Sequence, residues 1–296
     1  MTMTQQVPVF NRAAEDIGNI VELGHVNVEV ADQGVATTFY VAGLGLTRDP
    51  FLMTATNNMW VNVGKSQFHL PTRKPQVLRG VTGLVVPDLG ALRERLDRVA
   101  PQLAGTKFAT RDHGSAVEAT SPYGNRLRMH APDPARFGPV VLGMAYVAFD
   151  VNPGTADGIA RFYREIIDAP AEVIEDDGVR TARVPVGYRQ WFDFRETHGP
   201  EEPYDGHHVQ VYLANFSTPY ERLLKRGLIS QESNQHQYRF VDIIDLDTSR
   251  VLFQIDHEVR SMTHPMYGRP LVNRDPRMNN QTFHPGQENL AWAMSS

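Results

Sequence analysis

Short runs of alternating apolar and polar residues fill most of the chain, and stretches with helical spacing interrupt them. In residues 21–46 an alternating strand is followed by a polar turn and a short helix, and residues 140–169 repeat this order. The matched positions are Leu23-Gly24 with Leu142-Gly143, and Phe39-Tyr40 with Phe162-Tyr163. The pattern predicts that the second half of the chain repeats the first.

Each half contains a second strand and helix. After Asp88, a predicted helix cap, four apolar residues follow at helical spacing: Leu89, Leu92, Leu96 and Val99. The later counterpart, residues 206–227, runs from an alternating strand into a helix that we expect to end at Gly227. Short strands separated by turn residues follow each helix, so the chain is predicted to be an α+β protein with four β-α-β-β-β units.

The proline-rich segment Ala131-Pro132-Asp133-Pro134 is the best candidate for a linker between the halves. We therefore expect an N-terminal extension over residues 1–20, a first domain over 21–134 and a second over 135–261. Residues 262–296 contain several prolines and little periodicity, which favours a C-terminal tail that wraps the protein or makes a contact.

Composition excludes several classes of function. The 296 residues are 41% hydrophobic and 21% charged, as in folded proteins, and the net charge of −5 leaves no basic surface for nucleic acid. The absence of cysteine excludes disulfides, thiolate metal sites and a cysteine nucleophile, and it suits a reducing compartment. Neither a signal peptide nor an apolar run of membrane-spanning length occurs, so we expect a cytoplasmic protein without membrane contact.

Four segments carry a family resemblance: Leu-Gly-His-Val-Asn-Val at 23–28, Ser-Pro-Tyr-Gly-Asn-Arg at 121–126, His207-His208, and Phe-Gln-Ile-Asp-His-Glu at 253–258. With the four units, they make residues 20–272 resemble the vicinal oxygen chelate superfamily, which includes glyoxalases, bleomycin resistance proteins and dioxygenases. The two-domain type I extradiol ring-cleavage dioxygenases are the most similar group. The resemblance implies two tandem domains, each a pair of units forming a cup-shaped sheet, with a divalent metal chelated by two substrate oxygens.

The resemblance also implies a set of metal ligands. The dioxygenases hold iron(II) in the second domain with two histidines and one carboxylate, and His208 and Asp256 stand at two of these positions. Met144 stands at the third, where a thioether is a poor ligand for iron(II). The expected site is therefore incomplete, and an ordinary strand role for His208 and Asp256 stays open.

The first half offers an alternative metal site. His25 stands at the ligand position of the first unit, and His69 and His130 stand in the closing strands of the first two units. Three imidazoles suit zinc, iron or copper. The other interpretation is that these histidines are half-buried strand residues bonded to backbone groups.

Further candidates surround the substrate in the resembled enzymes. His236 and Tyr238 match a histidine and a tyrosine that bond substrate oxygens and move protons, although loop packing would explain them equally. Met144, Trp191 and Phe194 would line the substrate pocket, unless these aromatic residues are plain core.

Three classes of function remain open from the sequence. The first is an iron(II)-dependent extradiol dioxygenase acting on an aromatic diol or another small vicinal-oxygen substrate. The second is an isomerase, lyase or transferase of the same superfamily that uses another divalent metal. The third is a small-molecule-binding protein without a metal, or a lapsed paralogue, for which Met144 is the main argument. We expect a homo-oligomer in each case, because proteins of this architecture often assemble through sheet edges and tails.

Overall fold

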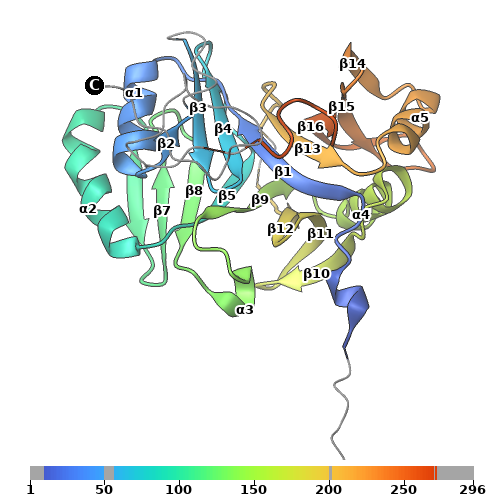
Figure 1. Ribbon diagram of the computed structural model, residues 1–296, viewed down its shortest axis with the longest axis horizontal. Helices are drawn as coiled ribbons and strands as arrows, with labels where there is room; N and C mark the ends of the chain where they lie inside the picture. Colours follow the sequence, from blue (N-terminus) through green and yellow to red (C-terminus); the bar gives the residue numbers. More distant parts are fainter. Residues whose placement is uncertain (1–9, 50–56, 200–201, 270, 272–296) are drawn as a thin grey trace, which may run out of the picture.

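The four predicted β-α-β-β-β units are present in the computed structural model, which describes residues 10–49, 57–199, 202–269 and 271 (Figure 1). The sequence Phe51-Leu52-Met53-Thr54-Ala55 predicts one of the short strands of the first unit, and it lies outside these residues, as does most of the expected tail. The first unit follows a short 3-10 helix (η1, Arg12–Glu15) and comprises β1 (Ile20–Asn27), α1 (Gln33–Thr37) with its continuation η2 (Thr38–Gly43), β2 (Thr47–Arg48), β3 (Asn58–Val63) and β4 (Ser66–Pro71).

The other three units follow the same order of elements. The second comprises β5 (Gly80–Val85), α2 (Leu89–Val99), η3 (Ala100–Leu103), β6 (Ala109–Asp112), β7 (Ala116–Thr120) and β8 (Arg126–His130), and α3 (Pro134–Phe137) follows it. The third comprises β9 (Gly143–Val151), α4 (Ala156–Phe162), η4 (Tyr163–Ile167), β10 (Glu172–Asp176), β11 (Val179–Gly187) and β12 (Gln190–Glu196). The fourth comprises β13 (His208–Leu213), α5 (Ser217–Lys225), β14 (Ile229–Asn234), β15 (Gln237–Ile244) and β16 (Val251–Ser261).

The helix cap, the apolar helix face and the helix end predicted from the sequence are confirmed. The side chain of Asp88 accepts a hydrogen bond from the backbone N–H of Ala91 at 2.9 Å and so caps α2. The four apolar residues predicted for one face of this helix are all buried. After α5, Gly227 adopts φ +69°, a left-handed conformation that ends the helix without strain.

The units pair across the two halves of the chain. One eight-stranded sheet has the order β14-β15-β16-β13-β1-β4-β3-β2 and joins the fourth unit to the first, whereas the other has the order β10-β11-β12-β9-β5-β8-β7-β6 and joins the third to the second. The α+β class with two units in each sheet is confirmed. We expected units that follow one another along the chain to share a sheet, and the observed strand order corrects this expectation. The domain limits 21–134 and 135–261, which rest on the repeat in the sequence, stay a prediction.

The reason for this correction lies in the edge strands. The first strand of every unit leaves one side unpaired until another first strand joins it. All four units carry a similar pattern, so the pattern alone does not select the partner. In the structure β1 pairs with β13 and β5 pairs with β9, both antiparallel.

The two faces of the first sheet differ in polarity. Side chains such as Val26, Val209 and Ile255 enter the main core, while the alternate positions of the same strands carry histidines, amides and charged groups. Helices α1 and α2 lie together at one end of the molecule, and α4 and α5 lie at the other (Figure 1). The first sheet therefore has one apolar face in the core and one polar face, which carries the candidate functional residues.

Aromatic residues dominate the core beside the fourth unit. Phe194 stacks on Phe149 with ring centroids 5.0 Å apart, and Phe253 meets both rings. In the part of the chain that the structure describes, no helix is long and apolar enough to cross a membrane.

His257 is a buried, neutral histidine in this core. The Tyr163 hydroxyl donates to its Nε2 at 2.6 Å, and its Nδ1 donates to the Ile255 carbonyl at 2.8 Å, so the ring carries a single proton. Burial lowers the pKa of His257 to about 4, against the opposing effect of the Ile255 bond. The ring also stacks on Phe240 at 4.2 Å.

Because an unfolded histidine has a pKa near 6.5, the unfolded chain binds more protons than the folded one between about pH 6.5 and 4. We expect the free energy of unfolding to fall by up to about 3 kcal/mol over this range through His257 alone. A double variant, His257→Phe with Tyr163→Phe, removes both polar groups and should show a shallower loss in urea unfolding at pH 7, 6, 5 and 4. Equal slopes in wild type and double variant would contradict the assignment.

Candidate metal centre

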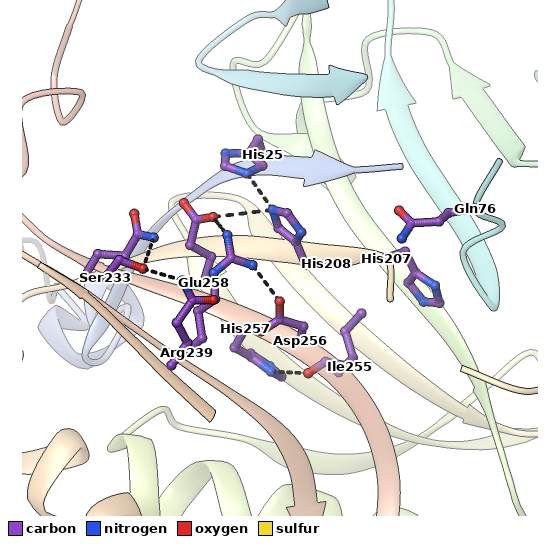
Figure 2. A network of polar contacts seen from close by, with 12 residues as sticks. His25, Gln76, His207, His208, Ser233, Arg239, Ile255, Asp256, His257 and Glu258 are labelled. Atoms are coloured by element: carbon purple, nitrogen blue, oxygen red, sulfur yellow. Dashed lines mark hydrogen bonds and ion pairs between the residues drawn. The ribbon is translucent and has the colours of Figure 1, made fainter. Parts of the chain in front are cut away.

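Three histidines from distant parts of the chain meet on the polar face of the first sheet. His25 on β1, His69 on β4 and His208 on β13 each offer a ring nitrogen, and these atoms lie within 4.8 Å of one another. The Nε2 atoms of His25 and His208 are 3.3 Å apart. Glu258 on β16 brings its Oε2 to 3.4 Å from His208 Nε2, so this carboxylate adjoins the group of three histidines (Figure 2).

A local two-fold relation between the first and fourth units explains this convergence. β1 and β13 are antiparallel in the centre of the sheet, with β4 parallel to β1 and β16 parallel to β13. His25 lies opposite Gln210, and His208 lies opposite Asn27. In turn, His69 lies opposite Asn27 and Glu258 lies opposite Gln210. The two-fold relation therefore places His208 in the fourth unit where His25 lies in the first, and Glu258 where His69 lies.

This relation distinguishes Glu258 from the predicted ligand Asp256. Asp256 lies opposite His208, which is the place that Gln67 occupies opposite His25. The structure pairs the Asp256 carboxylate with Arg239 at 2.6 Å (Figure 2). Sequence reasoning missed Glu258, although it shares a strand face with Asp256. The repeat that relates His25 to His208 was the signal that could have selected it.

The donor set fits a divalent metal ion. Metal–nitrogen bonds of about 2.0–2.1 Å place neighbouring ligands roughly 3.0–3.4 Å apart, as the two spacings at His208 Nε2 are. A single ring nitrogen cannot make good hydrogen bonds to both His25 and Glu258, because it carries either one proton or one lone pair. A cation bound at His208 Nε2 would replace these two competing contacts.

Burial keeps His25 and His69 neutral, which is the form of histidine that binds a metal ion. Burial holds the pKa of His25 well below its usual range and lowers the pKa of His69 to about 3, so both rings are neutral at pH 7. His69 Nε2 donates to Asn58 Oδ1 at 2.7 Å, and its ring stacks on Trp60 at 3.9 Å. These contacts fix the orientation of the ring and leave the lone pair on Nδ1 available for a metal ion.

Two arginines hold the carboxylate. Arg239 bridges Glu258 and Asp256 (Figure 2). Arg260 reaches Glu258 Oε1 at 2.5 Å. Burial alone would raise the pKa of Glu258, but the contact with His208 and the nearby positive charges outweigh it and hold that pKa far below its usual range. Glu258 is therefore a carboxylate at neutral pH.

A cavity of about 600 Å³ adjoins the centre on the side of His25 and Gln210. Arg260, Arg269 and Lys65 contribute positive charge to its walls. The side chains of Tyr212 and Tyr267 also line it. Glu22 also lies on the wall, and burial raises the pKa of its carboxyl to about 7 against the attraction of Lys65. Sequence reasoning missed Glu22, which follows a plain strand pattern.

Four other predicted site residues lie in the second sheet. Met144 is buried on β9, opposite Leu84, and the expectation that it shares a cavity with His208 is wrong. His130 Nε2 lies 2.9 Å from the Tyr146 hydroxyl, and Trp191 stacks on the Tyr146 ring at 5.8 Å. Phe194 belongs to the main core. The cause is the pairing of the units, which separates these strands from β1 and β13.

The predicted pair His236 and Tyr238 does not reach the centre. Tyr238 alternates with Arg239 along β15, so Arg239 faces the polar side while the tyrosine is buried in the core with its hydroxyl 3.5 Å from the Phe216 carbonyl. His236 is half-buried in the preceding turn, with Nδ1 3.1 Å from the Thr263 hydroxyl. His207 points away from the cluster and pairs with Asp205 at 2.6 Å (Figure 2).

Two solved structures superpose on most of this chain. A putative dioxygenase from Bacillus subtilis subsp. subtilis str. 168 superposes with a TM-score of 0.55 at 16% identity, over 84% of this chain and 87% of that one. Glyoxalase I from Zea mays superposes with a TM-score of 0.58 at 13% identity, over 81% of this chain and 92% of that one. No family model and no curated protein matches the sequence.

The chain has the vicinal oxygen chelate fold. Identities this low establish the fold alone. In this vicinal oxygen chelate fold the candidate ligands come from the first and the last unit.

Substitutions can separate the two carboxylates. We expect Glu258→Gln to weaken divalent metal binding by more than the roughly 10- to 100-fold that loss of an outer hydrogen bond causes, and Asp256→Asn to leave it within that smaller range. Metal content after dialysis and calorimetric titration would measure both. Met144→His should gain no metal, since it lies in the other sheet. Equal losses in the two carboxamide variants would contradict the assignment of Glu258.

Proposed function

We propose that this protein is a divalent-metal-dependent enzyme of the vicinal oxygen chelate superfamily that acts on a small substrate with two adjacent oxygens. The observation that carries the proposal is the group of His25, His69 and His208 beside a cavity of substrate size, with the Glu258 carboxylate 3.4 Å from His208 Nε2. The bound metal would polarise a substrate carbonyl and make the adjacent C–H more acidic.

The number of ligands favours a reaction without dioxygen. Four protein donors on an octahedral ion leave two open positions, which two substrate oxygens would fill. A ring-cleaving enzyme needs a further position for dioxygen. We therefore favour the isomerase or lyase class over the dioxygenase class.

Glu22 supports the same class of reaction. Its carboxyl makes no hydrogen bond or ion pair with any residue that the structure describes, and its pKa of about 7 suits a group that both accepts and returns a proton at neutral pH. Lys65 and Tyr212 face it, with Tyr267, Arg260 and Arg269 on the other walls of the cavity. We assign to Glu22 the transfer of a proton at the carbon next to the substrate carbonyl.

A second candidate is an iron(II)-dependent ring-cleavage dioxygenase for an aromatic diol. The specific observation in its favour is that Arg239 and Arg260 already pair with Glu258. If the arginines keep the carboxylate, the three histidines alone would hold iron, and three positions would stay open.

The two candidates differ in their use of oxygen. Protein loaded with zinc, nickel or manganese should exchange the carbon-bound protons of dihydroxyacetone for deuterium in D₂O, followed by proton NMR without oxygen. Protein loaded with iron(II) should consume no oxygen with catechol. Rapid oxygen uptake with ring cleavage, and no proton exchange, would replace the first candidate by the second. Failure to bind any of these metals would reject both.

Replacing the proposed proton carrier gives a separate prediction. We expect Glu22→Gln to retain full metal content and to slow the deuterium exchange by about 10²- to 10⁴-fold, because the amide cannot accept the proton. In the wild type, the exchange rate should rise with pH through about 7 as Glu22 ionises. Lys65→Met, which leaves the carboxyl in place, is the control and should shift this midpoint upward. An unchanged rate in Glu22→Gln would exclude the role.

A further inference from the structure

We infer that Gln210 binds the substrate directly, with its Nε2 donating a hydrogen bond to a substrate oxygen that lies next to His25 and His208. This inference rests on the proposed function and extends it, because it assigns a substrate-binding residue and the chemical type of the oxygen bound there. Gln210 is not among the candidate site residues predicted from the sequence.

The position of Gln210 satisfies the geometric requirement. It lies on β13, directly opposite His25 and two residues beyond His208 on the same strand face. Its side chain is only 1% exposed, yet it lines the cavity beside the candidate metal centre. Gln210 and His25 both line this cavity, so a molecule bound beside His25 would also lie beside the Gln210 amide.

The amide of Gln210 holds an unused donor. Among the residues that the structure describes, none accepts a hydrogen bond from its buried Nε2. Native proteins rarely leave such a donor unsatisfied, and the exceptions call for an explanation such as a bound ligand. The neighbouring cavity residue Gln67 differs in this respect, since its Nε2 donates to Asp49 at 2.6 Å and to Asn62 at 2.8 Å.

Gly24 makes room for this amide. A Cβ atom at position 24 would lie 1.9 Å from Gln210 Oε1 and 3.0 Å from the Tyr212 ring. Both contacts are shorter than, or at the limit of, what packed atoms tolerate. A side chain at position 24 would therefore displace the Gln210 amide from its place beside His25.

The local two-fold relation supplies a matched control. Asn27 lies opposite His208 as Gln210 lies opposite His25, and it is likewise a buried amide with one unpartnered atom among the described residues, its Oδ1. Asn27 is not part of the cavity wall. Loss of the Asn27 amide tests the general effect of removing a buried amide next to a ligand, without touching the substrate space.

The donor also restricts the ligand. An N–H group binds a carbonyl oxygen or an oxyanion, so the substrate oxygen nearest to Gln210 is an acceptor. Together with two adjacent oxygens at the metal, this describes an α-oxygenated carbonyl compound. Acetohydroxamate, which presents a carbonyl oxygen beside an N–O⁻ oxygen, is a suitable probe.

The experiment titrates acetohydroxamate into protein loaded with the divalent metal that the wild type retains, with metal content measured in parallel. We expect Gln210→Met to weaken acetohydroxamate about tenfold, the effect of one lost hydrogen bond, at unchanged metal content. Asn27→Leu should keep the wild-type affinity. Gly24→Ala should lose as much as Gln210→Met, and the double variant should lose no more than either, because both changes remove the same contact.

The outcomes separate this inference from the proposed function. Wild-type protein that binds metal and acetohydroxamate, with equal affinity in Gln210→Met, would overturn the role of Gln210 and leave the metal centre standing. Equal losses in Gln210→Met and Asn27→Leu would also overturn it, since they would show a general packing effect. Wild-type protein that binds no metal, or binds acetohydroxamate equally well without metal, would reject the proposed function and this inference with it.

Discussion

The antiparallel pairing of β1 with β13 is the interaction on which the rest of this structure depends. It joins the first unit to the fourth and brings His25 to 3.3 Å from His208, which is 183 residues away in the chain. Asn19, just before β1, reinforces the same junction by donating to the carbonyls of Ile167 and Asn215, both at 2.9 Å. Without this pairing the candidate ligands would lie on two open sheet edges.

A polar face of this kind is stable because its charges are paired or neutral. Burying an isolated carboxylate is costly, yet Glu258 lies between Arg239 and Arg260, and the nearby rings of His25 and His69 stay uncharged. Two buried amide atoms without partners among the described residues, Asn27 Oδ1 and Gln210 Nε2, lie on strands β1 and β13 beside the histidines. A bound metal and substrate would satisfy these atoms.

The second sheet shows what the same topology becomes without this chemistry. Its central strands β5 and β9 are antiparallel, and each has a parallel neighbour, β8 or β12, as in the first sheet. At its centre Gly83 lies opposite Tyr146, whose ring fills the space that a side chain at position 83 would need. Trp191 and Phe137 extend this aromatic stack. One fold thus carries a polar centre in one sheet and apolar packing in the other.

The sequence by itself determined the local structure and the repeat. Alternation, helical spacing and caps such as Asp88 are local signals, and they were sufficient for the four units and the α+β class. They also placed His25, His69 and His208 among the candidate ligands, but in two competing sites. Only the tertiary structure decided that these histidines form one group, that Glu258 and not Asp256 approaches His208, and that Met144 lies elsewhere. The physical reason is that strand partners are chosen by long-range packing, and four similar units offer the edge of β1 several equivalent partners.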